Sequence, residues 1–527
     1  MRIASLSILP LLATIASLSA LALPASAAAP RPVSVSTAAY AAPVDDALSL
    51  ALSSSAEVLS LDDAVAAAVV QRLTYLTTLQ SEVTARGALK TQYGTYDPTL
   101  NLQFSNAAAR NRTVVTPGVI PAPVDTRNPQ FEGKLIQNLP TGGQLTYDVK
   151  DNGQQQIPFS TLHQAVATLS LAHPLLRGAG LGAAYAPVRA AFAALQSAQA
   201  SSLRGLEQAI ADAENAYWNL MSAEGQEEAA RLSLIAADKL LERNRELEKR
   251  KLIAAYDVLT ADAGAGQRRA AFIEAARTRR DARDALLFTV FGEETARRYK
   301  DGGYELRTAT VAPNIPELPD EAVAEEKALD SREDLAAQRY GLRQADITLV
   351  QLRSNMLPDL SAVGSVGGTG NWQTGEQSAR EEAVRRAMRW DDKIWSLGLS
   401  FNFPLFLRAD RGKYLSGLAA RETQRLAVVT SENQVRIDVR SATRAVVFET
   451  RRWQEAGRVA DLYQRQLEGE RRRLDLGLSD SYRLLQVEHD ATQARLDLAS
   501  AHLALSSALT NYRLAIGTIS DAYRKSP

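Results

Sequence analysis

The amino-acid sequence predicts a mainly α-helical fold with a smaller β portion, built from two copies of one pattern. Its 527 residues are rich in Ala, Leu, Arg, Glu and Gln and only 6% are aromatic, which favours helices. Long stretches repeat apolar residues every seven positions, and shorter stretches alternate apolar with polar residues. The order of helix, strands, long helix, turn and return helix occurs twice, which indicates an internal duplication.

The charge balance and the lack of cysteine exclude several functional classes. The chain has 60 Lys and Arg against 60 Asp and Glu, whereas a general nucleic-acid-binding protein needs a basic excess. With no Cys, it has no disulfide framework, thiolate metal site, cysteine nucleophile or lipid-modified N-terminal cysteine. We therefore expect no nucleic-acid partner.

The N-terminus has the pattern of a signal peptide, predicted for residues 1–27. Arg2 supplies the positive start, an apolar run extends to Leu23, and Ala25-Ser26-Ala27 is a small-x-small cleavage site. An uncleaved membrane anchor is the alternative, but a proline and several hydroxyl side chains in the run disfavour it. The chain is therefore expected to be exported. Residues 28–58, rich in Ala, Ser, Pro and Val, are expected to form a disordered lead-in.

Two repeats follow, predicted for residues 59–292 and 317–517. A linker of residues 293–316 joins them, and residues 518–527 form a C-terminal tail. Each repeat opens with a helical pattern that ends at a proline and passes into alternating segments. Each then continues into a very long helical segment that turns over near its middle. No later stretch of eighteen apolar residues predicts a membrane-spanning helix.

The alternating segments predict strands of a barrel wall. In the clearest one, the residues on one face are large and apolar, namely Trp395, Leu397, Leu399, Phe401 and Phe403, and those between them are small or polar. Segments of about nine to eleven residues are long enough to cross a bilayer as tilted strands. A soluble half-buried sheet has the same alternation. Export, and only four clear strands with unpaired edges, favour a membrane barrel closed by several copies.

A further hairpin is predicted at residues 129–152. It turns at Thr141-Gly142-Gly143 and lies either in the barrel or beyond it.

The long helical segments carry heptad repeats. Apolar residues recur every seven positions at Val439, Val446, Trp453, Ala460, Leu467 and Leu474, and after the turn at Leu484, Ala491, Leu498, Leu505 and Tyr512. One helix over residues 418–474 would be roughly 85 Å long, more than a globular domain requires. A coiled-coil hairpin of a structural protein is the alternative interpretation.

No catalytic, cofactor or metal site is predicted, and we do not expect an enzyme. The four histidines are widely separated and form no metal-binding spacing. The glycine-rich segment at 178–182 lacks the Gly-Lys-Ser/Thr ending of a phosphate loop and predicts a tight turn.

The duplicated order of elements resembles the TolC-like outer membrane efflux protein family. Short phrases agree with the family at the corresponding places: Leu61-Asp62-Asp63-Ala64, Pro98-Thr99-Leu100, Pro358-Asp359-Leu360, Pro404-Leu405-Phe406 and Gly477-Leu478-Ser479. Each phrase alone is weak, whereas their order and duplication are more specific. The resemblance covers roughly residues 58–518, nearly all of the mature chain.

This resemblance implies a homotrimer that forms one outer-membrane β-barrel and one long periplasmic α-helical barrel. It implies the exit duct of a tripartite efflux or type I secretion system in a Gram-negative bacterium. Substrate would pass passively from an inner-membrane pump of the RND, ABC or MFS type. The other implied partners are a periplasmic adaptor (membrane fusion protein) and outer-membrane lipid. The implied location is the outer membrane, with a large periplasmic portion.

The resemblance also assigns roles to the two helical tips. The adaptor-contacting residues would be Lys251, Leu252, Ile253, Gly477, Leu478 and Ser479. Asp257 stands where the family's first tip often has an aspartate that helps to hold a periplasmic gate shut.

The chain departs from the family pattern at both tips. Lys251 stands where the family usually has Gly, which puts the shape of the first turn in doubt. Arg483 and Gln486 replace aspartates that ring the entrance in some members, so an acidic ring is not assumed. We hypothesise that Arg483 faces Asp257 across the closed tip, because these positions are equivalent in the repeats, 226 residues apart. An exposed pair contributes about 1 kcal/mol or less per contact.

A periplasmic coiled-coil adaptor or scaffold protein without a barrel is the alternative function. An adaptor normally has one helical hairpin between halves of compact β domains. This chain has two hairpins and two strand sets, which favours the duct.

Overall fold

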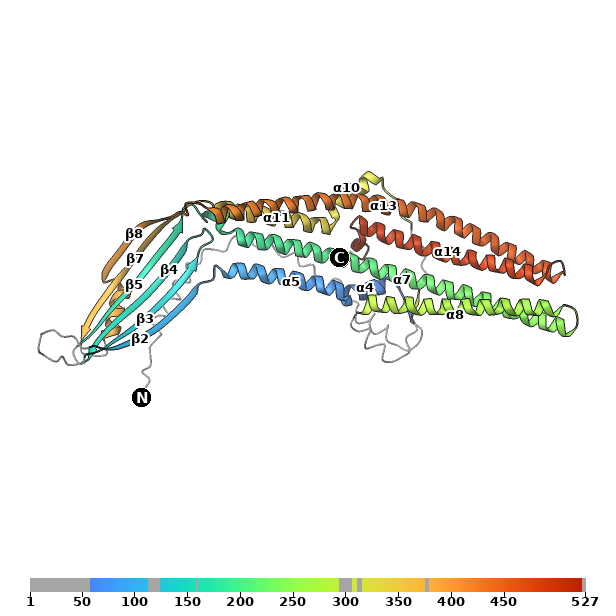
Figure 1. Cartoon of the computed structure of the whole chain (residues 1–527), viewed down its shortest axis with the longest axis horizontal. Coiled ribbons are helices and arrows are strands. Elements are labelled where there is room, and N and C mark those ends of the chain that lie inside the picture. Colours follow the sequence, from blue (N-terminus) through green and yellow to red (C-terminus); the bar gives the residue numbers. More distant parts are fainter. Residues whose placement is uncertain are drawn as a thin grey trace.

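The computed structural model describes residues 57–111, 124–157, 160–292, 306–309, 315–374 and 379–523. The predicted signal peptide and nearly all of the lead-in lie outside the described residues, as does most of the 293–316 linker. The described part is elongated, with a sheet at one end and two helical hairpin tips at the other (Figure 1).

The first repeat contains four strands between two sets of helices. Its elements are β1 (Glu57–Leu59), α4 (Leu61–Gln71), α5 (Leu73–Gly94), β2 (Thr99–Asn111), β3 (Val124–Asn138), β4 (Gln144–Ile157), β5 (Ser160–Pro174), α6 (Gly180–Ala184), α7 (Ala186–Lys249) and α8 (Ala255–Phe291).

The second repeat has corresponding opening and hairpin helices but only two long strands, with an additional helix, α12, between them. Its elements are β6 (Leu306–Thr308), α10 (Glu321–Ser331), α11 (Glu333–Ser354), β7 (Asp359–Thr374), α12 (Ala379–Arg389), β8 (Asp392–Asn402), α13 (Arg408–Asp475), α14 (Ser481–Ala515) and the short 3₁₀ helix η3 (Ile519–Ala522). The opening helices match in length, with 11 residues in α4 and α10 and 22 in α5 and α11.

The sheet joins strands of both repeats in the order β2-β3-β4-β5-β7-β8, and all neighbours are antiparallel. Its six strands exceed the four that alternation alone predicts. The hairpin predicted at 129–152 lies within the sheet as β3 and β4, with Gly142 at φ 94° in the turn. A small parallel pair of β1 with β6 brings the starts of the two repeats together.

The heptad positions of α13 and α14 are largely buried, as the repeat pattern predicts. Buried examples are Val439, Val446, Ala491 and Leu505, each at most 2% exposed. The helix predicted at 418–474 is longer at both ends, because α13 has 68 residues and therefore spans about 100 Å. Within the described ranges, none of the helices combines the length and apolar character that a membrane span requires.

Candidate functional site

One face of the six-stranded sheet exposes large apolar side chains. In β8, Trp395, Leu397, Leu399 and Phe401 are each 65–79% exposed. Leu100, Leu102 and Phe104 of β2 are also exposed. The register places both sets on one face, because paired residues of neighbouring strands and alternate residues along a strand share a side. An exposed apolar face this wide indicates a surface that contacts a membrane or another protein.

The opposite face of the sheet is polar and charged. Glu132 of β3 contacts the ammonium groups of Lys134 at 2.9 Å and Lys150 at 3.2 Å. Asp148 pairs with Lys150 at 3.2 Å. Ser365 and Ser396 share a hydrogen bond of 2.7 Å between β7 and β8. This alternation, apolar on one side and charged on the other, is typical of a barrel wall between lipid and water.

The two edges of the sheet are formed by β2 and β8, which are the first and last of its strands in chain order. Neither edge is paired within the described part of the chain. Their exposed backbone groups are therefore available for pairing with another copy.

At the far end, the two helical hairpins turn over with the same backbone geometry. In the first, the amide of Leu252 donates to the carbonyl of Leu247 at 2.9 Å, and Lys251 has φ 59°. In the second, Leu478 donates to Arg473 at 2.8 Å, and Gly477 has φ 73°. Both turns are Schellman motifs. Lys251 thus occupies the left-handed position of Gly477, and the first turn is not displaced.

The residues after these turns cap the return helices in different ways. Asp480 precedes α14, and its carboxylate accepts from the amide of Arg483 at 2.8 Å. Ala254 precedes α8 and has no side chain that can cap. Instead, Asp257 accepts from the amide of Ala254 at 3.2 Å. Asp257 therefore stabilises the start of its own helix, whatever else it contacts.

Each tip also exposes a leucine and a tyrosine at equivalent positions. Leu252 and Tyr256 in the first tip are matched by Leu478 and Tyr482 in the second, and all four are exposed. The leucines are among the tip residues predicted from the sequence, whereas the tyrosines are not. The 226-residue repeat spacing relates both pairs and was the signal that would have found them.

Comparisons with known proteins agree with this arrangement. No family model matches the chain, and no curated protein matches it by sequence. Solved structures do match. The CmeC outer membrane channel of Campylobacter jejuni is 15% identical, with a TM-score of 0.63 over 87% of this chain and 85% of that chain. The outer membrane protein VceC of Vibrio cholerae is 15% identical, with a TM-score of 0.61 over 87% of this chain and 96% of that chain.

A third match is the open state of the MtrE outer membrane channel of Neisseria gonorrhoeae. It is 16% identical, with a TM-score of 0.60 over 87% of this chain and 88% of that chain. The chain has the fold of the TolC-like outer membrane channels. These structural neighbours are channel proteins rather than enzymes.

In this TolC-like fold, the predicted tip residues lie at the two turns. Lys251 and Leu252 are exposed and Ile253 is half-buried, while Gly477 and Leu478 are exposed. The hydroxyl of Ser479 donates to Glu470. Arg483 lies 3.6 Å from the same Glu470 carboxylate. No hydrogen bond or ion pair joins Asp257 to Arg483 within the described part of one chain, so their pairing stays a prediction.

The two hairpins of the TolC-like fold contact each other near the tips. Arg243 of α7 pairs with Asp475 of α13 at 3.0 Å. Leu240 packs in one apolar cluster with Leu467 and Leu484. Beside it, burial raises the pKa of Glu488, although Arg471 lies 3.2 Å from its carboxylate. These contacts hold the hairpins side by side within one chain.

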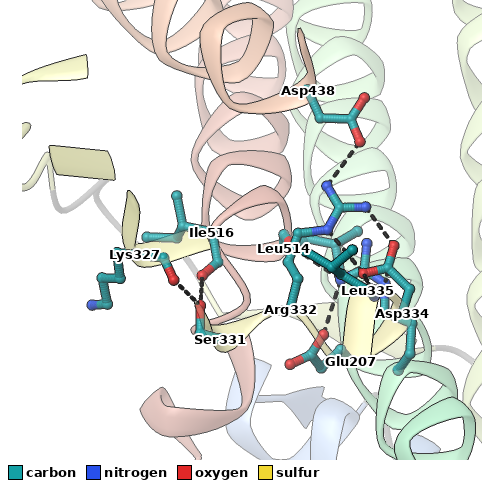
Figure 2. Close-up of polar contacts among 10 residues, drawn as sticks. Glu207, Lys327, Ser331, Arg332, Asp334, Leu335, Asp438, Leu514 and Ile516 are labelled. Atoms are coloured by element: carbon teal, nitrogen blue, oxygen red, sulfur yellow. Dashed lines mark hydrogen bonds and ion pairs between the residues drawn. The ribbon is translucent and has the colours of Figure 1, made fainter. Parts of the chain in front are cut away.

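Near the middle of the molecule, a buried arginine marks the break between the short and long opening helices. Arg332 is 6% exposed and donates to Asp438 of α13 at 2.8 Å and to Asp334 (Figure 2). In the first repeat, Arg72 occupies the equivalent break and pairs with Asp212 of α7. Each arginine therefore fixes a short helix to the long helix of its own repeat.

The helix break at Arg332, in the second repeat, also contacts the first repeat. Glu207 of α7 accepts from Arg204 at 2.9 Å, and Arg204 donates to the carbonyl of Leu514 in α14 at 3.0 Å (Figure 2). Burial raises the pKa of Glu207, and its hydrogen bond with Arg204 opposes that shift. Ser331 donates to the carbonyl of Ile516 at 2.6 Å. Arg204 also lies 3.9 Å from Asp334 of α11, so the network links α7, α11, α13 and the C-terminal end of α14.

No group of three His, Asp or Glu side chains among the described residues is arranged to hold a metal ion. The exposed apolar face of the sheet and the exposed leucines and tyrosines of the tips are the candidate functional surfaces.

Proposed function

We propose that this protein is one protomer of a homotrimeric exit duct that lies in the outer membrane and extends far into the periplasm. It would give passive passage to substrate delivered by an inner-membrane pump of the RND, ABC or MFS type, in a tripartite efflux or type I secretion system. The observation that carries the proposal is a six-stranded sheet, apolar on one face and open at both edges, continuous with helices about 100 Å long.

Closure by several copies follows from the cost of open edges. Unpaired backbone amides and carbonyls are strongly disfavoured in lipid, where no water satisfies them. Pairing β8 of one copy with β2 of the next would close the sheet. Three copies of six strands each would make an eighteen-stranded barrel, rather than the twelve strands expected from four per chain. Its charged inner face would line an aqueous lumen.

The helical tips would meet a periplasmic adaptor. Leu252 with Tyr256, and Leu478 with Tyr482, give each protomer two similar exposed apolar patches. Tyrosine is enriched in protein interfaces because it combines a large apolar ring with a polar end. Three protomers would present six such patches in a ring, each suited to the same type of adaptor contact.

Engineered disulfides test the closure directly, because the natural chain contains no cysteine. Gln103→Cys in β2, combined in turn with Ser396→Cys, Gly398→Cys or Ser400→Cys in β8, places thiols on the polar face of both edges. Four strands separate these edges within one chain. We expect oxidation of isolated outer membranes to give covalent dimers and trimers, and nothing larger.

The matched control pairs Gln103→Cys with Thr168→Cys, which lies on the same face in the interior strand β5. It should remain monomeric. Electron microscopy of the detergent-extracted protein should show a three-fold tube more than about 100 Å long. A monomeric rod that fractionates with soluble periplasmic protein would contradict the duct and support the adaptor or scaffold alternative.

A further inference from the structure

The short helix α12 lies on the apolar face of the sheet, although its own sequence is rich in arginine. Ala383 and Ala387 of α12 form one buried cluster with Val149, Ala165 and Ala167 of β4 and β5. Ala167 pairs with Gly368, which shares the face of Val366 and hence of Trp395. The helix therefore covers the side of the sheet that carries the exposed aromatic and aliphatic residues.

Glycines in β7 bring α12 unusually close to the sheet. A β-carbon at Gly368 would lie 2.7 Å from the carbonyl oxygen of Ala387, and one at Gly370 would collide with the carbonyl oxygen of Ala383. Side chains at these two positions would force the helix away. The contact of these two glycines with Ala383 and Ala387 thus defines the position at which α12 packs on the sheet.

Polar and aromatic contacts fix the same helix along its length. Arg380 lies 3.2 Å from Asp151, which is 1% exposed and also contacts His163 at 3.0 Å. The Arg380 guanidinium lies over the ring of Phe131 at 5.2 Å, and that of Arg386 over Trp372 at 4.5 Å. A buried polar group that has hydrogen-bonding or ionic partners, as Asp151 has, fixes the orientation of the elements that it joins. The helix is therefore a fixed part of the sheet surface.

The outward side of α12 concentrates positive charge toward its C-terminal end. Arg385, Arg389 and Lys393 are exposed there, and Arg385 shares Glu382 with Arg386. The side chains of Arg389 and Lys393 make no ion pair or hydrogen bond within the described part of the chain. Residues 381–393 hold four cations, Arg385, Arg386, Arg389 and Lys393, and four acids, Glu381, Glu382, Asp391 and Asp392. Glu381 and Glu382 lie in the first turn of α12. Asp392 pairs with Thr369 and therefore lies on the opposite face of the sheet from Lys393, which pairs with Gly368 on the side of α12.

The position of α12 along the strands places this charge near one boundary of the apolar band. Gly368 lies nine residues beyond Asp359, where β7 begins next to the long helices, so the distance along the strand is roughly 30 Å. For a barrel strand tilted by about 40°, this corresponds to a rise of roughly 23 Å along the membrane normal, close to the apolar band of about 25 Å in an outer-membrane barrel. In the orientation of the proposed duct, on which this step rests, α12 lies at the outer surface of the outer membrane. It contacts the interior strands β4, β5 and β7, so copies joined through β2 and β8 would leave it uncovered.

We infer that α12 binds the phosphate groups of an anionic lipid in the outer leaflet through Arg389, Lys393 and Arg385. A fixed amphipathic helix with aromatic rings beneath it and free cations on its outer side matches a membrane interface. Guanidinium and ammonium groups pair with phosphate by charge-assisted hydrogen bonds. The apolar band next to α12, including Trp395, would contact the acyl chains of the same lipid.

Binding of diphosphoryl lipid A to the purified full-length protein in nonionic detergent tests the inference. The double variant Arg389→Gln/Lys393→Gln should bind this phosphate-bearing lipid at least about tenfold more weakly than the natural protein. The exchange Arg389→Lys/Lys393→Arg keeps both charges and should bind normally. Arg451→Gln/Arg458→Gln removes two exposed arginines of α13, far from the sheet, and should have no effect.

Three results would overturn the inference. One is unchanged binding in the first double variant, and another is equal binding of the lipid after enzymatic removal of its phosphates. The third is displacement of the lipid by equimolar inorganic phosphate, which would indicate a site for free anions. Trimer formation and membrane fractionation are measured on the same samples. A chain that does not enter the membrane contradicts the duct and the lipid site together, whereas a membrane trimer with unchanged binding contradicts the lipid site alone.

Discussion

The two helical hairpins have the same backbone at their tips but different side chains. Lys251 and Gly477 occupy the same left-handed position, and the same pair of backbone hydrogen bonds closes each turn. Three residues later, Ala254 is matched by Asp480, and three beyond that, Asp257 is matched by Arg483. The hydrogen bonds of the turn therefore define its shape, and the side chains are free to differ in charge and in capping.

The difference indicates that the first tip is held less firmly than the second. A lysine in the left-handed region is disfavoured relative to glycine by roughly 1 kcal/mol. The first return helix also lacks a capping side chain at its N-cap. The second tip has both a glycine in the turn and the Asp480 cap. The first tip is thus the more easily opened of the two.

The largest effect on the free energy of unfolding is expected at Arg332 and Arg72, the arginines at the breaks between the short and long opening helices. Arg332→Ala should lower the unfolding free energy by about 2 kcal/mol, because the buried Arg332 guanidinium donates to the partly exposed carboxylates of Asp438 and Asp334 and both contacts are lost. Arg72→Ala should cost less, since Arg72 contacts a single carboxylate, that of Asp212, and is more exposed. Denaturant unfolding of the detergent-solubilised protein measures both. Equal decreases in the free energy of unfolding would contradict the prediction that Arg332 contributes more than Arg72.

The opposite charges at the tips are expected to act between copies. If Asp257 and Arg483 pair across the closed tip, each pair would stabilise the closed state by up to about 1 kcal/mol. Asp257→Ala or Arg483→Ala should therefore raise single-channel conductance in planar bilayers several-fold. Asp257→Asn separates this role from capping, because its amide oxygen still accepts from Ala254. Wild-type conductance in both alanine variants would count against the gate.

Changes at the two N-cap residues should reverse the order of stability of the two tips. Ala254→Ser adds a side-chain oxygen at the N-cap of α8 and should stabilise the first tip by about 1 kcal/mol. Asp480→Ala should destabilise the second by a similar amount, because the amide of Arg483 loses its acceptor. Hydrogen exchange at the two tips would report each change. A shift at the wrong tip, or none, would disprove the capping argument.

The smallest effect is expected at the turn itself. Lys251→Gly removes the steric cost of the left-handed conformation but adds flexibility to the unfolded chain, so a net gain of about 0.5 kcal/mol is expected. Gly477→Lys should have the opposite sign. Limited proteolysis within residues 249–255 and 475–481 would compare the two. Slower cleavage after Gly477→Lys than in the natural protein would contradict the argument.

The sequence predicted the long helices and their seam because a heptad pattern of many residues has one low-energy arrangement, with Val439 and Leu505 inside. It predicted the turns at Lys251 and Gly477 through the repeat. It left open whether the hairpin at 129–152 belongs to the sheet, because alternation along a strand does not say which strands it pairs with. The structure includes this hairpin as β3 and β4, which makes six strands. The sequence did not identify α12, whose buried face consists mainly of two alanines.

By itself, the sequence determined the periodic features of this protein: the duplication, the heptad seam and the alternating faces of the clearest strands. These depend on residues close together in the chain, where helix and strand periods decide which side chains share a face. Only the tertiary structure decided the six-strand order and the position at which α12 packs on the sheet. Those depend on Gly368, Ala387 and Ala167 meeting across three elements, and a close approach between distant segments leaves no period in the sequence.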